Sequence, residues 1–211
     1  MMKTVLCFGD SNTWGTVPDE DRRYDLTERW TSLLKIALPA HFEVIEAGQP
    51  GRTTVHDDPF NAGRNGLQYL RPCLESHVPD LVLIMLGTND LKHRFGLSPD
   101  DISRGASVLV ETVLKFDTAC KKKAPKVLLI SPPPIYEVGE FADMFAGGAT
   151  KSLSLAKYYQ ASAEKLGCSY FDAGSVVTSC NKEGIHWDAE QHQLFANALV
   201  PIIQTIFSHD I

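Results

Sequence analysis

The chain has 211 residues, of which 44% are hydrophobic, and its net charge is −6. This length suits a single α/β domain over residues 1–211. The negative charge argues against a nucleic-acid or anionic-membrane surface, because both need clustered positive charge. The basic run at residues 121–123 is expected to be a solvated helix end. Without a membrane-spanning stretch or a signal peptide, the sequence predicts a cytoplasmic protein.

Short apolar runs alternate along the chain with longer segments of helical periodicity. This pattern predicts strands at residues 4–8, 42–46, 80–86, 126–131 and 169–172, and helices at 28–38, 66–77, 99–122, 151–166 and 189–207. Ser98 and Pro99 are typical of a helix start, and Gly167 of a helix end. Because apolar strands alternate with helices, the sheet should be parallel and covered on both faces, as a three-layer α/β/α sandwich.

A serine follows the first predicted strand directly. Ligands bind outside the carboxyl ends of the strands in an open α/β sheet, so Ser11 is a candidate nucleophile. Its hydroxyl needs a base, a group that orients the base, and donors for the developing oxyanion. Asn89, after the third strand, can supply an amide N–H. Gly48 and Gly51, after the second, allow a backbone N–H to approach a substrate closely.

The candidate base lies near the other end of the chain. A carboxylate three residues before a histidine in a tight turn can accept the Nδ1–H, as Glu183 stands to His186, and this orients Nε2 toward a serine. An ordinary loop histidine beside a solvated glutamate is the alternative. The order serine, acid, histidine matches α/β hydrolases, but the G-x-S-x-G elbow is absent. The pattern therefore requires a different serine scaffold.

Four sequence blocks occur in the order Gly9–Ser11, the segment around Gly51, Gly87–Asp90, and a last block ending at His186. Together they resemble the SGNH, or GDSL-type, hydrolase family over essentially the whole chain, and its arylesterase and acyltransferase subgroup in particular. The resemblance implies a flavodoxin-like five-stranded parallel sheet. It also implies a serine nucleophile, a histidine base and an oxyanion hole, formed by the backbone N–H groups of Ser11 and Gly51 and the side chain of Asn89.

The chain departs from this family at two positions. The family pattern is D-x-x-H, and here Glu183 stands at the acid position; we expect it to orient the histidine, with Asp188 or a backbone carbonyl as alternatives. Asn12 stands where the family more usually has leucine, and is predicted to make the acyl pocket more polar or narrower. Trp14 and Trp187 flank the serine and the histidine, and are predicted to bind substrate, with plain core packing as the alternative.

Three further charged residues lie in these blocks. Asp10 and Asp90 are expected to hold their turns through hydrogen bonds to loop amides. Arg52 is expected to pair with Asp57 or Asp58 rather than to face a substrate carboxylate. The long loop at residues 132–148 carries several aromatic residues, and is interpreted either as an apolar flap or as a subunit contact.

The sequence thus predicts a serine esterase acting on short-chain, acetyl-type esters, with acyl transfer to alcohols as a further outcome. We expect a small-molecule ester as the partner, a homo-oligomer, and no metal or cofactor. The same site also suits a carbohydrate acetylesterase, a thioesterase or a lysophospholipase. A non-catalytic flavodoxin-like binding domain is the remaining alternative, although the turn after the first strand lacks both G-x-G-x-x-G and a P-loop lysine.

Overall fold

The computed structural model describes residues 2–117 and 124–208. Its centre is a five-stranded sheet in the order β2-β1-β3-β4-β5, and all neighbouring strands are parallel. The strands are β1 (Lys3–Gly9), β2 (Phe42–Gly48), β3 (Leu81–Met85), β4 (Lys126–Ser131) and β5 (Ser169–Asp172). This is the strand order of flavodoxin-like sheets, so the predicted fold class is confirmed.

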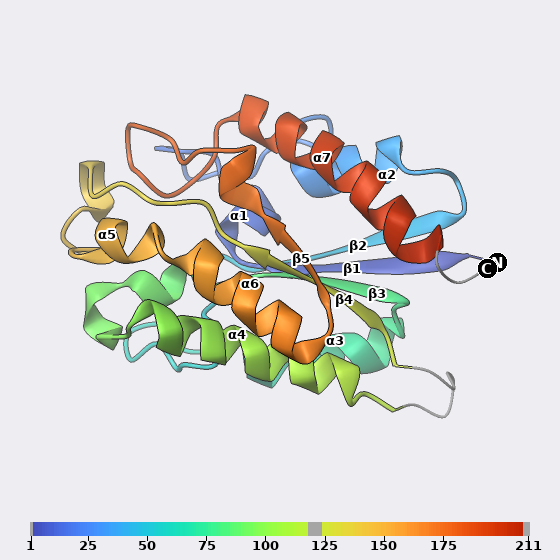
Figure 1. The fold of residues 1–211 in the computed structure, drawn as a ribbon. Coiled ribbons are helices and arrows are strands. Elements are labelled where there is room, and N and C mark those ends of the chain that lie inside the picture. The colour runs from blue at the N-terminus through green and yellow to red at the C-terminus, as the bar shows by residue number, and fades with distance from the viewer. Residues whose placement is uncertain (1, 118–123, 209–211) are drawn as a thin grey trace.

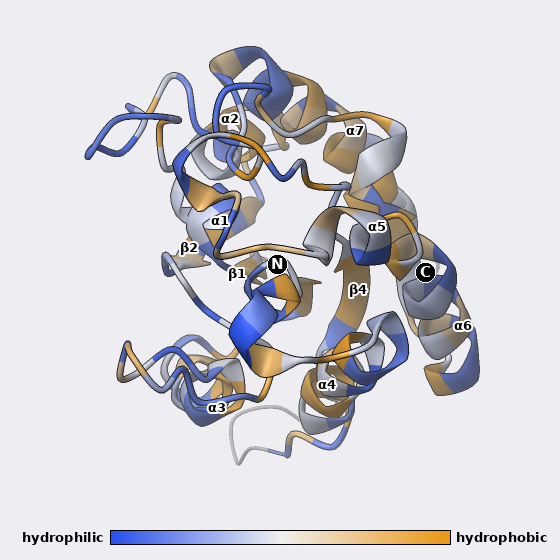
Figure 2. Ribbon diagram, turned by 90° about the vertical axis from the view of Figure 1, so that its left-hand side faces the viewer, coloured by the Kyte–Doolittle hydropathy of each residue, from blue (hydrophilic) through white to orange (hydrophobic). Residues whose placement is uncertain are grey.

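Helices cover both faces of the sheet (Figure 1). One face carries α2 (Trp30–Ala37) and α7 (Ala189–Ser208), and the other carries α3 (Gly66–His77), α4 (Pro99–Leu114) and α6 (Leu155–Leu166). Two short helices, α1 (Ser11–Trp14) and α5 (Gly148–Ser152), lie at the carboxyl end of the strands, which faces the viewer in Figure 2. No helix among the described residues has the length and apolar character that crossing a bilayer demands.

Two apolar clusters hold the three layers together. Successive residues of a strand point to opposite faces, so Leu83 packs in the cluster beneath α2 and α7, while Val82 and Ile84 pack in the cluster beneath α3, α4 and α6. All five residues of β3 are buried. The continuous apolar sequence of this strand therefore follows from its position between two helical layers.

Most of the predicted element bounds are right to within a few residues. Helix α4 ends at Leu114 instead of residue 122, and the basic run at 121–123 lies outside the described residues. The helix predicted over 151–166 is two helices, α5 and α6. The capping box of α4 is confirmed, because Ser98 Oγ accepts from the Asp101 N–H and the Asp101 carboxylate accepts from the Ser98 N–H, both at 3.1 Å.

The topology decides where a site can form. From β1 the chain runs to β2 on one side of it, and then crosses to β3 on its other side. Loops that leave the carboxyl ends of β1 and β3 therefore diverge, and the crevice between them is the usual ligand position in such sheets. The segments after β1, β2 and β3 carry Ser11, Gly51 and Asn89 respectively.

Candidate active site

Ser11 is the first residue of α1, directly after the turn that ends β1. Asp10 caps this helix, since its Oδ1 accepts from the Asn12 N–H at 3.0 Å, as predicted for this carboxylate. The turn requires glycine at position 9, because a Cβ there would lie 2.0 Å from Thr13 Oγ1. The serine hydroxyl is thus held at a fixed point at the carboxyl edge of the sheet.

The imidazole of His186 lies between the serine and a carboxylate. Its Nε2 is 3.0 Å from Ser11 Oγ, and its Nδ1 is 2.6 Å from Glu183 Oε2. The carboxylate accepts the Nδ1–H, which leaves the Nε2 lone pair facing the serine hydroxyl. Glu183 rather than Asp188 contacts the imidazole, so the glutamate occupies the position that the family pattern gives to aspartate.

The Glu183 carboxylate is buried but well supplied with donors. Its Oε1 accepts from the backbone N–H of Ile185 at 3.1 Å and from that of His186. Burial would raise the pKa of Glu183, but the hydrogen bonds and the charge of His186 outweigh it, and the pKa lies below its usual 4.5. The group therefore stays ionised and keeps the imidazole in one tautomer.

The turn that carries these two residues depends on Gly184. Its φ is +82°, and a Cβ there would lie 2.0 Å from the carbonyl oxygen of Tyr136. The Tyr136 N–H also donates to the Gly184 carbonyl at 2.9 Å. Only glycine fits this close approach, so the segment after β4 fixes the histidine loop, residues 183–188.

The three residues predicted to form the oxyanion hole line the cavity beside the serine hydroxyl. Asn89 Nδ2 donates one hydrogen to the Arg52 carbonyl at 3.1 Å, which orients the amide and leaves its second hydrogen for the cavity that Asn89 lines. Within the described part of the chain, the backbone N–H groups of Ser11 and Gly51 donate no hydrogen bond. The three segments predicted to form the oxyanion hole are therefore brought together around one cavity.

The cavity has a volume of about 220 Å³. Its lining residues are Ser11, Thr16, Pro50, Gly51, Asn89, Lys92, Phe141, Met144, Phe145, Ile185 and His186. Phe141, Met144 and Phe145 of the 132–148 loop form one wall, where the Phe141 ring meets the His186 ring edge-on at 5.8 Å. This part of the loop therefore borders the cavity.

Four lining residues were missed from the sequence: Thr16, Pro50, Lys92 and Ile185. Pro50 directly precedes Gly51, Ile185 directly precedes His186, and Lys92 follows the 3₁₀ turn Asn89–Leu91 that carries the oxyanion amide. For Pro50 and Ile185, adjacency to a predicted residue was the available signal.

Three predicted substrate-binding residues lie away from this cavity. Trp187 is fully buried and packs against His192 and Phe195, so it belongs to the core, the alternative considered above. Trp14 lies against the Arg23 guanidinium, 5.3 Å from the ring centroid. Asn12 is 2% exposed, and its side chain points to the histidine loop instead of the substrate space. Proximity in sequence misled these predictions, because adjacency to a catalytic residue does not fix the direction in which a side chain points.

Arg52 contacts other groups than Asp57 or Asp58, the partners predicted from the sequence. Arg52 donates to the carbonyl oxygens of Gly9 at 2.8 Å and Ala47 at 2.5 Å, and so links the ends of β1 and β2. Asp58 instead pairs with Arg94 at 3.1 Å and with Lys92 at 3.5 Å. The prediction for Asp90 is confirmed, since it accepts from the backbone N–H and the hydroxyl of Thr54.

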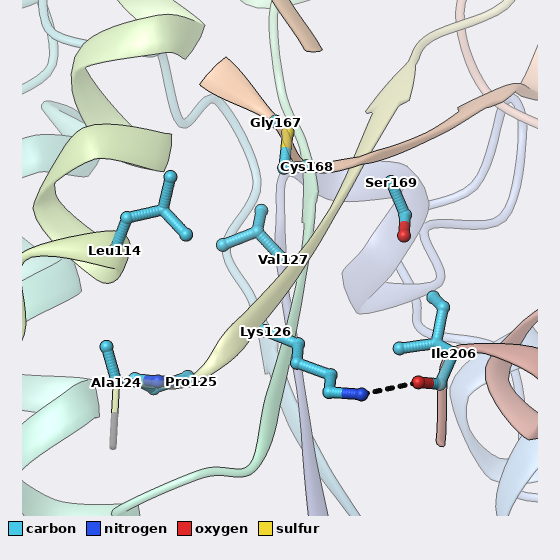
Figure 3. A pocket seen from close by; sticks show the side chains of 9 residues that line it. All are labelled: Leu114, Ala124, Pro125, Lys126, Val127, Gly167, Cys168, Ser169 and Ile206. Atoms are coloured by element: carbon cyan, nitrogen blue, oxygen red, sulfur yellow. Dashed lines mark hydrogen bonds between the residues drawn. The ribbon is translucent and has the colours of Figure 1, made fainter. Parts of the chain in front are cut away.

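A larger cavity, of about 430 Å³, lies at the opposite end of the strands, beside the start of β4 and of β5 (Figure 3). It contains the thiol of Cys168 and the hydroxyl of Ser169, and the Lys126 ammonium donates to the Ile206 carbonyl at 2.6 Å. Burial raises the pKa of Cys168 to about 11, so the thiol is protonated near neutral pH. None of its lining residues is a histidine, so this cavity has no imidazole base for either nucleophile.

Comparison with known proteins identifies the family of this chain. The sequence pattern of the GDSL-like lipase/acylhydrolase family matches residues 7–194. The chain belongs to this family. As a GDSL-like acylhydrolase it is a carboxylic ester hydrolase, and the alternative of a non-catalytic binding domain no longer applies.

Solved structures of an aryl esterase and of a carbohydrate acetylesterase family member match nearly the whole chain. The native aryl esterase of M. smegmatis is 44% identical, with a TM-score of 0.93 over 96% of this chain and 99% of that one. A carbohydrate acetylesterase family member from Sinorhizobium meliloti is 39% identical, with a TM-score of 0.94 over 98% and 100%. The lipoprotein YqeF of Bacillus subtilis is 35% identical over 86 residues, which span 41% of this chain and only 31% of YqeF.

Proposed function

We propose that this GDSL-like hydrolase cleaves short-chain, acetyl-type esters through a covalent acyl-enzyme on Ser11. The observation that carries the proposal is the row of contacts from the Glu183 carboxylate through His186 to the Ser11 hydroxyl, 2.6 Å and 3.0 Å long, beside a cavity bordered by N–H donors. A hydroxyl within hydrogen-bond reach of an oriented base is an activated nucleophile.

In the first half of the reaction, His186 Nε2 takes the hydroxyl proton while Ser11 Oγ forms a bond to the ester carbonyl carbon. The carbonyl electron pair moves to oxygen, and the oxyanion is stabilised by the N–H groups of Ser11, Gly51 and Asn89. Ionised Glu183 stabilises the imidazolium that forms. When the oxyanion collapses, the alcohol leaves with the proton from Nε2, and the acyl group remains on Ser11.

In the second half, His186 takes a proton from a water molecule, whose oxygen attacks the acyl-enzyme. The acid then leaves and Ser11 recovers its proton. Phe141, Met144 and Phe145 make one wall of the cavity apolar, which lowers the local water content relative to an open site. We therefore also propose that alcohols compete with water, so that transesterification accompanies hydrolysis.

The cavity volume favours small acyl groups. About 220 Å³ is below the roughly 300–1,000 Å³ typical of sites for drug-sized ligands, and the catalytic residues themselves border it. An acetyl group fits this space, whereas the long acyl chains of lysophospholipids extend beyond it. Hydrolysis of acetylated carbohydrates is the second candidate, supported by the similarity to the Sinorhizobium meliloti protein.

The proposal is tested by replacing Ser11 and following turnover of p-nitrophenyl acetate. Ser11→Ala should lower kcat by at least about 10⁴-fold, because removal of a triad serine has effects of this size or larger. A fluorophosphonate should label the wild type at Ser11 and leave the variant unlabelled. Ser169→Ala, in the opposite cavity, is the matched control and should retain full activity. Turnover by Ser11→Ala at the wild-type rate would refute the assignment.

A substrate panel then separates the candidate esters. p-Nitrophenyl acetate, butyrate and octanoate report the acyl length, and an acetylated sugar reports the leaving group. We expect kcat/KM to fall with acyl length, because the cavity wall limits the chain. A preference for octanoate would contradict the proposed acetyl specificity.

Cellular location and assembly are proposals as well. Cys7, Cys73, Cys168 and Cys180 are free thiols, which suits a reducing compartment such as the cytoplasm. We propose a homo-oligomer, and light scattering of the purified protein measures its mass directly.

A further inference from the structure

Asn12 connects the nucleophile to the base across the fold. Its Nδ2 donates to the carbonyl oxygen of Ile185 at 3.1 Å, and 173 residues separate the two in sequence. Asn12 directly follows Ser11, and Ile185 directly precedes His186. The amide bridge therefore runs beside the catalytic contact and joins the same two segments.

Few hydrogen bonds join the segment around Ser11 to the histidine loop. Within the described residues, two hydrogen bonds join residues 10–16 to the histidine loop: the catalytic pair itself and the Asn12 bridge. The other bonds of the loop hold it elsewhere, for example Cys180 N–H to the His186 carbonyl at 2.7 Å. Those bonds hold the loop to itself and to the segment after β4, whereas the Asn12 bridge ties it directly to the helix that carries the serine.

The other side of Asn12 is anchored in the core. Its backbone carbonyl accepts from Trp30 Nε1 at 3.0 Å, and the Trp30 ring packs edge-on against Phe195. Asn12 is 2% exposed, and its Oδ1 has no hydrogen-bond partner among the described residues. A buried, unpartnered carbonyl is destabilising, and an apolar side chain of similar size avoids this cost. The gain from this amide therefore lies in its donor end, which makes the bridge.

We propose that Asn12 is a positioning residue that sets the separation between Ser11 Oγ and His186 Nε2. It acts through Ile185 and has no contact with substrate, in contrast to the pocket role expected from the sequence. The inference rests on the proposed serine mechanism. Because a misplacement of about 1 Å can lower a rate by about 10²-fold, loss of the bridge should affect acylation more than substrate binding.

The test compares Asn12→Leu with Ser179→Ala. Ser179 Oγ also donates to the Ile185 carbonyl, at 3.4 Å, but has no link to α1. Asn12→Leu should lower kcat for p-nitrophenyl acetate by about 10- to 100-fold and slow fluorophosphonate labelling of Ser11 by a similar factor. KM and the ratio of acetate to butyrate turnover should stay within about twofold of wild type. Ser179→Ala should retain wild-type rates of turnover and labelling.

Three results would overturn the inference: wild-type labelling in Asn12→Leu, an equal loss in Ser179→Ala, or a changed acyl preference with an unchanged labelling rate. Asn12→Asp provides a second variant of the same shape, because at pH 8 it replaces the donor by an acceptor. It should reproduce the loss if Asn12→Leu fails to fold, and wild-type activity in it would equally count against the bridge. Labelling of the wild type at Ser11 tests the proposed function separately, so the two can fail independently.

Discussion

Two buried carboxylates lie on opposite sides of the site, and their surroundings have opposite effects. Glu183 in the histidine loop accepts from two backbone N–H groups and from the imidazole, and its pKa lies below the usual value despite burial. Asp10 in the turn after β1 accepts from the Asn12 N–H, and burial, the largest cause, raises its pKa to about 6. Burial alone therefore does not decide the direction of the pKa shift, because hydrogen bonds to the carboxylate and the charge of His186 act against it.

The two negative charges therefore have different effects on the site. Glu183 is stabilised as an anion by the folded protein, so it can hold an imidazolium with little rearrangement. Asp10 is destabilised as an anion, yet His186 is one of the groups that lower its pKa, so the two groups attract each other when both are charged. The ionised Asp10 carboxylate thus lowers the stability of the folded protein but stabilises protonated His186.

The strongest test of this comparison removes the carboxylate of Glu183. Glu183→Ala should lower kcat for p-nitrophenyl acetate by about 10²- to 10⁴-fold, because the imidazole loses its orienting partner and the imidazolium loses its counter-charge. Steady-state kinetics at pH 7.5 measure the effect. Glu164→Ala, at an exposed position of α6, is the control and should behave as wild type. A loss below about threefold in Glu183→Ala would mean that another group orients His186.

The negative charge of Asp10 should lower the stability of the folded protein, whereas that of Glu183 should raise it. Its pKa is higher in the folded chain, about 6 against 3.8, so its contribution to stability is full below pH 3.8 and is lost as the pH rises through 6. The loss at pH 7.5 is on the order of 2–3 kcal/mol. Asp10→Asn removes this loss and keeps an acceptor for the Asn12 N–H, because asparagine is also a good N-cap.

Calorimetry across pH measures the Asp10 effect. The Tm of Asp10→Asn should exceed that of the wild type by on the order of 5 °C at pH 7.5, and the gap should close near pH 4. Activity should fall severalfold at pH 7.5, since His186 loses a nearby negative charge. A gap that is constant with pH would show that Asp10 is not destabilised by its charge.

Some features of the fold and of the site could be predicted from the sequence, and others could not. The fold, the strand ends and the carboxylate–histidine spacing are local patterns, and each could be predicted because apolar periodicity and a three-residue turn do not depend on distant segments. Arg52 could not be placed, because its partners are the carbonyl oxygens of Gly9 and Ala47, and a backbone carbonyl leaves no mark in a sequence. Asn12 and Trp187 were misplaced for a related reason: adjacency to a catalytic residue does not give the direction of a side chain.

The smallest expected effect is the change in stability, instead of activity, when Glu183 loses its charge. Its pKa is lower in the folded chain, so its contribution is present above pH 4.5 and is lost as the pH falls through the folded pKa. Glu183→Gln keeps an oxygen for the two backbone N–H groups but loses the charge, which should cost about 1 kcal/mol and about 2–4 °C at pH 7.5. Once the pH lies below the folded pKa of Glu183, this variant and the wild type should melt together. Glu183→Gln and Asp10→Asn should therefore shift Tm in opposite directions at neutral pH and both converge on the wild type in acid, whereas shifts of the same sign would mean that burial, not the donors, governs both carboxylates.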